Sequence, residues 1–401
     1  MPRARFNPPE RVEHLSILDE YGHVDAALDP RLPASELMRL YRHLILARRW
    51  DERMVLLNRQ GRIGNYPPFR GQEAASIGPA YVLDPRDWLI PSFRELSALV
   101  WHGWPMEKLI LGWWGGHEYG ASPPEGVNAL PLCGPVAGQC LHAAGLAWGC
   151  KLRGDGSVVV CFVGDGGTSE GDFYESLNIA GVFRLPLIMV VQNNQWAISM
   201  PRSRQTASAT LAQKALAFGF DGLQTDGNDI LSMVVATREA VDAARAGTGP
   251  TLIEALTYRM GPHSTSDDPR KYRDEAEVKM WQRRDPILRF EMYLSDRGLL
   301  NDDVKSRVTA EADERIAEAI ARADAYQANP LEPFDHCFAT RSADLERQRA
   351  ELEAFLAATG RLPAAPPPPP APSTPRQVDL SVIHARTFPP RPKQVPVAAS
   401  R

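Results

Sequence analysis

The stretch SVVVCFVGDGGTSEGDFYESLNIAGVFRLPLIMVVQNNQWAISM, residues 157–200, decides the fold. Residues 157–163 are a short apolar run rich in valine, as expected of a parallel strand that is buried on both faces. The glycine-rich turn 164–167 ends this run, and residues 170–181 are expected to form a helix. A second apolar run, 187–191, follows a proline. The pattern therefore predicts a strand, a turn, a helix and a second strand.

A polar residue follows the end of each predicted strand. The usual right-handed crossover would bring Asp165 and Asn194 to one crevice at the carboxyl ends of the strands, where open parallel sheets bind ligands. Mg²⁺ takes oxygen ligands, and the side chains of Asp165 and Asn194 with the main-chain carbonyl of Trp196 fit that role. The backbone N–H groups of Gly166 and Gly167 suit phosphate oxygens. A GDGG turn alone is also common in strand ends that bind nothing, but the later asparagine pair favours a magnesium–diphosphate site.

The order of GDG, helix, strand and NN resembles the thiamin diphosphate signature. The longer text of residues 164–199 resembles the alpha subunits of 2-oxoacid dehydrogenases, the decarboxylating component of the pyruvate and branched-chain complexes. The resemblance runs from about Leu37 to about Phe355. It includes the segments NRQGRIGNY, RGQEA, PEGVNALP, DGNDIL, GPTLIEALTYR and GPHSTSDDPRKYR.

Further strands and helices extend the central unit in both directions. Strands are expected near residues 88–94 and 251–258, and helices at 35–60, 132–153 and 230–245. At least four strands alternate with helices, which predicts an α/β fold with a doubly wound, mostly parallel sheet, helices on both faces and a helical C-terminal extension.

Three segments are expected along the chain. Residues 1–34 are interpreted as an N-terminal arm, and residues 35–355 as the cofactor-binding domain. Residues 356–401 contain the run RLPAAPPPPPAPSTPR and are expected to form a proline-rich, disordered tail.

The resemblance implies further site residues. Arg94 stands where the family's arginine binds the diphosphate, and Phe93 beside it replaces a frequent tyrosine. The backbone around Gly134 and Val136 is expected to contact the aminopyrimidine ring. His263 matches the catalytic histidine that touches the diphosphate and the reacting substrate, and an imidazole can both donate to phosphate and move protons near neutral pH.

The resemblance also implies the reaction and the partners. The cofactors are thiamin diphosphate and Mg²⁺, and a 2-oxoacid is decarboxylated with transfer of the acyl group to a lipoyl-bearing acyltransferase component. A separate beta subunit is expected to supply the activating glutamate, in a heterotetramer of two alpha and two beta chains. QGRIGNYPP and PEGVNALP favour pyruvate, whereas HSTSDD is shared with branched-chain enzymes. An acetoin dehydrogenase alpha subunit and a non-catalytic scaffold remain alternatives.

Composition excludes several other classes. A formal net charge of −4 over 401 residues favours neither nucleic acid nor an acidic membrane as a partner, and no apolar stretch is long enough to span a bilayer. Five scattered cysteines without a CxxC pair indicate reduced thiols in a reducing compartment, here the cytoplasm. A haloacid-dehalogenase-type phosphatase would need a DxDx motif, which the sequence lacks. Gly116-His117-Glu118 lacks the second histidine of a zinc motif.

Overall fold

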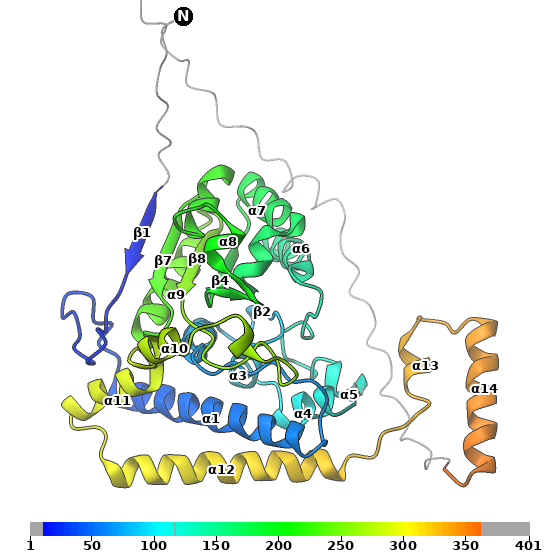
Figure 1. The fold of residues 1–401 in the computed structure, drawn as a ribbon. Helices are drawn as coiled ribbons and strands as arrows, with labels where there is room; N and C mark the ends of the chain where they lie inside the picture. The colour runs from blue at the N-terminus through cyan, green and yellow to red at the C-terminus, as the bar shows by residue number, and fades with distance from the viewer. Residues whose placement is uncertain (1–10, 116–117, 362–401) are drawn as a thin grey trace, which may run out of the picture. The chain divides into compact units, whose positions relative to one another are not determined.

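Six strands form one sheet in the order β1-β7-β8-β4-β3-β2, and every neighbouring pair in it is parallel (Figure 1). The strands are β1 (Val12–Leu15), β2 (Trp88–Ile90), β3 (Val159–Gly164), β4 (Leu187–Asn193), β7 (Gly222–Asp226) and β8 (Thr251–Leu256). A separate antiparallel hairpin consists of β5 (Trp196–Ala197) and β6 (Met200–Pro201).

This computed structural model describes residues 11–115 and 118–361. The segment Gly116-His117-Glu118, for which a zinc site was discounted, and the proline-rich run lie largely outside these ranges. Contacts divide the chain into two units, one of Met1–Lys151 and Asp155–Tyr326 and one of Leu152–Gly154 and Gln327–Arg401. The boundaries expected at residues 34 and 355 stay predictions. Within the described ranges, no helix combines the length and the apolar character needed to cross a bilayer.

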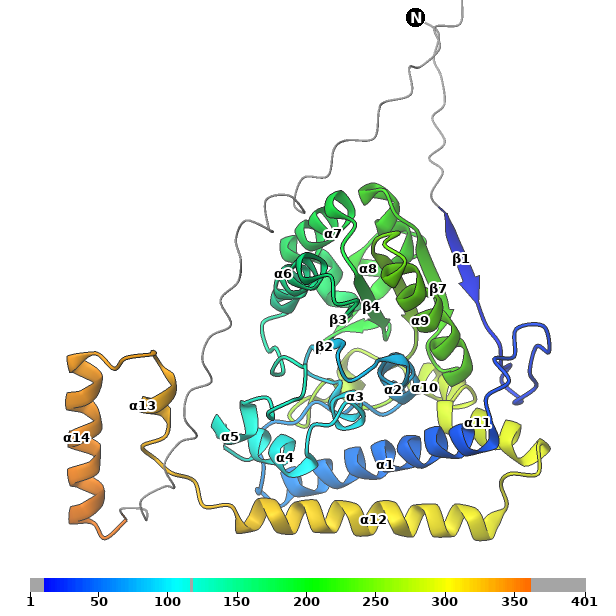
Figure 2. The ribbon, with the colours of Figure 1, turned by 180° about the vertical axis from the view of Figure 1, so that it is seen from behind.

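Helices cover both faces of the sheet in the first unit (Figures 1 and 2). The helices of this unit are α1 (Ala34–Arg59), α2 (Glu73–Val82), α3 (Leu96–Trp101), α4 (Met106–Gly115), α5 (Glu118–Ala121), α6 (Gly138–Arg153), α7 (Gly171–Phe183), α8 (Arg202–Gln205), α9 (Ile230–Arg245), α10 (Glu275–Gln282), α11 (Pro286–Asp296) and α12 (Asp302–Ala325). Three 3-10 helices are η1 (Asp165–Ser169), η2 (Ala212–Phe218) and η3 (Pro269–Lys271). The second unit contains α13 (Pro333–His336) and α14 (Ala343–Ala358).

The alternation of side chains along β3 explains the two layers. Val160 and Phe162 join one buried cluster with residues of α1, α2 and α9, while Cys161 and Val163 join another with residues of α6 and α7. Successive side chains of a strand point to opposite faces, so a strand covered on both sides must be apolar throughout. The doubly wound α/β fold expected from the sequence is confirmed.

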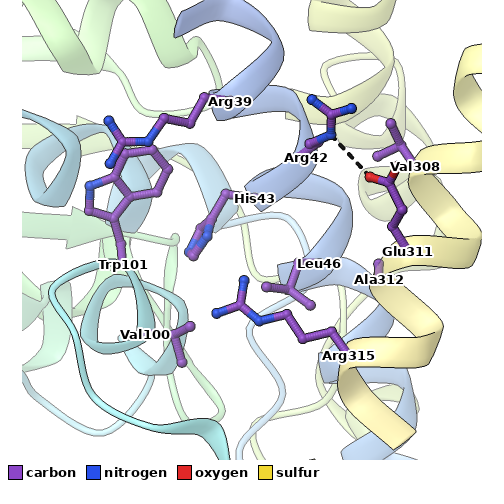
Figure 3. Close-up of a pocket in the computed structure, with 10 residues that line it drawn as sticks. All are labelled: Arg39, Arg42, His43, Leu46, Val100, Trp101, Val308, Glu311, Ala312 and Arg315. Atoms are coloured by element: carbon purple, nitrogen blue, oxygen red, sulfur yellow. Dashed lines mark hydrogen bonds and ion pairs between the residues drawn. The ribbon is translucent and has the colours of Figure 1, made fainter. Parts of the chain in front are cut away.

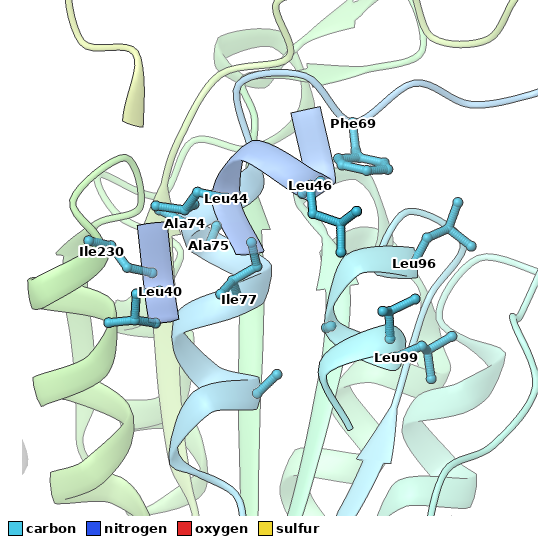
Figure 4. Packing of buried hydrophobic residues seen from close by; sticks show 14 of the residues in the cluster. Leu40, Leu44, Leu46, Phe69, Ala74, Ala75, Ile77, Leu96, Leu99 and Ile230 are labelled. Carbon is cyan, nitrogen blue, oxygen red and sulfur yellow. The ribbon is translucent and has the colours of Figure 1, made fainter. Parts of the chain in front are cut away.

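In the larger of these two buried clusters, which contains Val160 and Phe162, α1 packs against α2, α3 and α9. Leu40 and Leu44 are one helical turn apart on α1 and meet Ala75 and Ile77 of α2, with Ile230 of α9 beside them (Figure 4). All of these side chains are fully buried. Helix α12 lies alongside α1 in both views of the ribbon (Figures 1 and 2). The spacing of three and four residues on α1 is the pattern that predicted this helix.

One expectation about local structure was wrong, and the N-terminal segment holds a strand that was not expected. The expected helix at 132–153 begins only at Gly138, because Pro135 lacks a backbone N–H and Ala137 has a left-handed φ of 65°. The expected N-terminal arm contributes β1, the edge strand that pairs with β7. A carboxylate oxygen of Asp229 accepts the backbone N–H groups of Ile17 and Leu18 and so holds this segment to the sheet.

We predict that Leu44→Ala lowers the free energy of unfolding by about 2–5 kcal/mol, because it leaves a cavity in the core between α1 and α2. Leu56→Ala on the same helix is the matched control, since Leu56 is 44% exposed, and it should change stability by no more than about 0.5 kcal/mol. Urea unfolding of the two variants and the native chain gives the comparison. Equal losses in both variants would contradict this packing.

Candidate active site

The predicted site residues lie where the strands of the sheet end. Gly164 of β3 is opposite Gln192 of β4, and Asn193 of β4 is opposite Leu256 of β8. The segments that follow these three adjacent parallel strands therefore emerge at one edge of the sheet. Ligands of open α/β sheets bind at this edge.

Asp165 is the first residue after β3 and is 1% exposed. Its Oδ2 atom is buried and has no hydrogen-bond partner in the described part of the chain. Burial raises the pKa of Asp165 to about 6, although its own backbone N–H and the charge of Arg259 oppose the shift. A buried carboxylate oxygen without a donor is costly, so the position indicates a group that a bound cation would satisfy.

Asn194 lies beside Asp165 with its amide held in one orientation. Its Nδ2 donates to Oε1 of Gln72 over 2.9 Å, and its Oδ1 accepts the backbone N–H of Trp196 at 3.2 Å. Both Asn194 and Gln72 are buried. The amide oxygen keeps a second lone pair, so Asn194 can still offer an oxygen ligand.

Gly166 and Gly167 form a tightly packed turn within η1. A Cβ atom at Gly167 would overlap Cγ2 of Val163, and one at Gly166 would lie 2.9 Å from Cβ of Ala197. Only glycine fits at these two places without a shift of the surrounding chain. The turn keeps its backbone close to the sheet edge, as a phosphate-binding loop requires.

The segment containing Gly134 and Val136 lies against this turn. The backbone N–H of Cys133 donates to the carbonyl of Ser92, which places the segment beside the end of β2. Val136 is 50% exposed and contacts the position that a Cβ at Gly167 would take. No described atom lies within 4 Å of a Cβ built at Gly134. The loop therefore presents an open, partly apolar surface next to the turn.

Arg94 and His263 form a hydrogen-bonded pair. Arg94 donates through Nη2 to Nδ1 of His263 at 2.9 Å and to the His263 carbonyl at 2.8 Å, and through Nη1 to the carbonyl of Pro68 at 2.6 Å. A guanidinium can only donate, so Nδ1 accepts and the imidazole proton is on Nε2. Burial, with the charges of Arg94 and Arg259, lowers the pKa of His263 to about 4. The imidazole is therefore neutral near pH 7.

Other contacts hold the loop that carries His263. The backbone N–H of His263 donates to Asp267 over 2.8 Å, and the ring of Phe93 meets the imidazole edge-on with 6.1 Å between centroids. Asn65 accepts the backbone N–H of Ser266 through Oδ1 at 3.2 Å. Asn65 thus anchors the loop from the side of the NRQGRIGNY segment.

The main residue that sequence reasoning missed is Arg259. This arginine is fully buried. It donates to the carbonyls of Trp196 at 3.1 Å and Ile198 at 2.6 Å and to the hydroxyl of Tyr272 at 2.9 Å. Its Nε has no partner among the described residues. The one available signal was its place just after a strand that ends at the site, in the segment GPTLIEALTYR.

Strained backbone conformations are concentrated around the glycine turn at residues 164–167. Gln195 and Ile198 have positive φ values of 73° and 56°, and Ala137 has 65°. The left-handed conformation is an outlier for a β-branched residue such as Ile198, and such strain costs about 1–3 kcal/mol per residue. The contact of Arg259 with the Ile198 carbonyl helps to hold this conformation. Strained residues of this kind cluster at functional sites.

The oxygen atoms gathered at this edge of the sheet suit one kind of metal ion. Within the described ranges, no three His, Cys, Asp or Glu side chains gather in a way that could hold a metal ion. The cluster instead offers one carboxylate, one amide oxygen and one main-chain carbonyl, all hard oxygen ligands. Such a partial set fits Mg²⁺, which usually completes its octahedron with water and substrate phosphates.

We predict that the imidazole of His263 stays neutral down to about pH 4 and that Arg94→Gln raises its pKa, because a positive charge next to Nδ1 is removed. Arg70→Gln serves as the control, since Arg70 is an exposed arginine whose side chain pairs with Glu52. Ring C–H resonances followed against pH by NMR give the values. Titration of native His263 near pH 6.5 would contradict the geometry.

Comparison with known proteins adds independent support. A family model described as the dehydrogenase E1 component matches residues 41–332. A protein of Acholeplasma laidlawii named pyruvate dehydrogenase E1 component subunit alpha is 43% identical over 342 residues, which cover 84% of this chain and 99% of that protein. Proteins of the same name from Staphylococcus aureus and Staphylococcus epidermidis are 45% and 44% identical over 316 residues, covering 78% of this chain and 85% of each relative.

These matches confirm the resemblance that the sequence motifs indicated. They cover most of the chain, including every candidate site residue, and the fold has the sheet that the motifs imply. The chain belongs to the thiamin diphosphate-dependent dehydrogenase E1 component family, as an alpha subunit of a 2-oxoacid dehydrogenase.

Proposed function

We propose that this chain is the alpha subunit of a pyruvate dehydrogenase (acetyl-transferring) and that it binds thiamin diphosphate through Mg²⁺. The net reaction releases CO₂ from pyruvate and reduces the lipoyl disulfide of an acyltransferase component, which takes the acetyl group as a thioester. Support for pyruvate comes from the names of the relatives.

The observation that carries the cofactor proposal is the unpartnered Oδ2 atom of Asp165. A divalent cation at this point would offset the cost of burying the carboxylate, which the raised pKa of Asp165 reflects. In the proposal, Asp165, Asn194 and the carbonyl of Trp196 hold Mg²⁺. Arg259 fixes the Trp196 carbonyl from the other side and so positions the third ligand.

The diphosphate is proposed to lie between the glycine turn and Arg94. The backbone N–H groups of Gly166 and Gly167 and the guanidinium of Arg94 would donate to its oxygens. Burial and the nearby charge of Arg259 lower the pKa of Arg94 to about 10, so it still carries its charge at neutral pH. Phe93 packs beside this arginine without a hydroxyl to offer.

His263 is proposed to act at the substrate end of the site. With its proton on Nε2 and Nδ1 occupied by Arg94, the neutral imidazole offers one N–H donor to a substrate or phosphate oxygen. When bound, thiamin diphosphate supplies the electron sink that decarboxylation of a 2-oxoacid needs. The residues of this chain bind and orient it.

A beta subunit is proposed to complete the site. Val136, Ile198 and Met200 are 50%, 58% and 45% exposed, and all belong to segments at or next to the glycine turn. Apolar side chains gathered around a site are typical of a surface that a partner covers. In the proposal the beta subunit also supplies the activating glutamate and half of the cofactor pocket.

The experiment that tests the proposed activity uses the chain co-expressed with its beta subunit. Reduction of an artificial electron acceptor is measured with pyruvate, 2-oxoisovalerate and acetoin, each with thiamin diphosphate and Mg²⁺. The proposal predicts the highest kcat/KM for pyruvate. A preference for 2-oxoisovalerate or acetoin would assign the chain to a branched-chain or acetoin dehydrogenase, and no activity with any of them would indicate a scaffold.

We predict that Asp165→Asn weakens the Mg²⁺-dependent binding of thiamin diphosphate by more than about 100-fold. Replacing even a residue that only hydrogen-bonds to a metal ligand typically lowers metal affinity by about 10–100-fold. The same substitution should not lower the melting temperature of the metal-free protein. The pKa of Asp165 is raised to about 6, so at higher pH its buried carboxylate is charged and opposes folding, and the asparagine removes that charge.

Glu170→Gln is the control, because Glu170 is exposed and lies five residues further along the chain. Calorimetric titration of the assembled enzyme with and without Mg²⁺ measures the effect. Cofactor binding by Asp165→Asn that matches the control would rule out the assigned ligand.

A further inference from the structure

A polar cavity lies away from the strand ends, between α1, α3 and α12. Its volume is about 430 Å³. Figure 3 shows that side chains from all three helices point into it. It is lined by Arg39, Arg42, His43, Leu46, Val100, Trp101, Val308, Glu311, Ala312 and Arg315. None of these residues belongs to the site described above.

Positive charge exceeds negative charge in this cavity. Arg42 pairs with Glu311 over 3.1 Å, and Glu311 is the one acid among the lining residues. Arg39 lies over the ring of Trp101 at 4.4 Å. Arg315 forms no ion pair with any residue in the described ranges, and its guanidinium points into the cavity (Figure 3). Arg39 also pairs with Glu36, which does not line the cavity, over 3.4 Å, so Arg315 is the lining arginine whose charge is not paired within the described ranges.

His43 lies at the inner wall of the cavity. It is 8% exposed, and its Nε2 donates to the carbonyl of Ser97 over 2.8 Å. Burial, together with the charges of Arg315 and Arg39, lowers the pKa of His43 to about 4, although the hydrogen bond to the Ser97 carbonyl opposes the shift. The guanidinium of Arg315 thus shares the cavity with Arg39 and the buried imidazole of His43. An anion bound between Arg39 and Arg315 would compensate their positive charges.

We propose that this cavity binds a small phosphate-bearing anion at a site separate from the thiamin diphosphate site. Planar guanidinium groups match phosphate oxygens with two parallel N–H bonds, and they lose less hydration than an ammonium group when they bind. The apolar side chains of Leu46, Val100 and Val308 line the same cavity.

The size of the cavity favours a small molecule. Ligand pockets usually measure about 300–1,000 Å³, and this volume is within that range.

The cavity is also connected to the candidate active site through α3, because Arg94 lies two residues before Leu96, the first residue of that helix. The carbonyl of Ser97 that holds His43 belongs to the first turn of the same helix.

The test is a calorimetric titration of the full chain with inorganic phosphate and, separately, with phenyl phosphate at constant ionic strength. Arg315→Gln should weaken binding at least about tenfold, the effect of losing one charge-assisted hydrogen bond. Arg307→Gln is the matched control, since Arg307 is exposed on α12 and does not line the cavity. It should bind as the native chain does.

A second variant separates this site from the cofactor site. Arg94→Gln removes the proposed diphosphate contact and should leave this phosphate binding unchanged, even if the proposed function fails. In NMR spectra, added phosphate should raise the pKa of His43 in the native chain and not in Arg315→Gln. Tighter binding of phenyl phosphate than of inorganic phosphate would identify an organic phosphate as the ligand class, and equal binding a free phosphate. Absence of saturable binding, or equal binding by Arg315→Gln, would overturn the proposal.

Discussion

The buried negative charge of Asp165 is the constraint around which the candidate site is arranged. Its carboxylate is 1% exposed and one oxygen has no donor in the described part of the chain. Two buried arginines, Arg94 and Arg259, lower its pKa against the effect of burial. The same two arginines keep His263 neutral. The positive charges of Arg94 and Arg259 therefore favour an ionised Asp165, which can bind a cation, and also a neutral His263 at the proposed substrate end.

The scaffold that holds this charge is the parallel sheet. Three adjacent strands, β3, β4 and β8, end at one edge in register, and the residues after them supply Asp165, Asn194 and Arg259. Hydrogen bonds from Arg259 to the Trp196 and Ile198 carbonyls join the segments after β4 and β8. A rigid site of this kind needs little rearrangement when it binds its ligand.

Much of this could be predicted from the sequence because the signals were local. The strands β3 and β4 are apolar throughout, and a right-handed crossover brings their ends together, so the meeting of Asp165 and Asn194 followed from the pattern. The edge strand β1 was missed because Glu13 and His14 are exposed and break any apolar run. Its pairing depends on Asp229, more than two hundred residues later.

The parts that could not be predicted depend on distant partners. Arg259 bonds to a carbonyl 63 residues earlier in the chain, and Gln72 orients an amide 122 residues later. Neither contact produces a periodic pattern in the sequence. The positive φ of Ala137 likewise has no local signal, because alanine usually continues a helix. Contacts of this kind become visible only in the folded chain.

The most direct measurement is anomalous diffraction from crystals of the assembled enzyme grown with thiamin diphosphate and Mn²⁺ in place of Mg²⁺. The proposed site predicts one strong manganese peak within about 2.0–2.3 Å of Oδ2 of Asp165, Oδ1 of Asn194 and the carbonyl oxygen of Trp196, close to the distances of Mg²⁺ ligands. A manganese peak elsewhere, with Oδ2 of Asp165 still without a partner, would contradict the assignment.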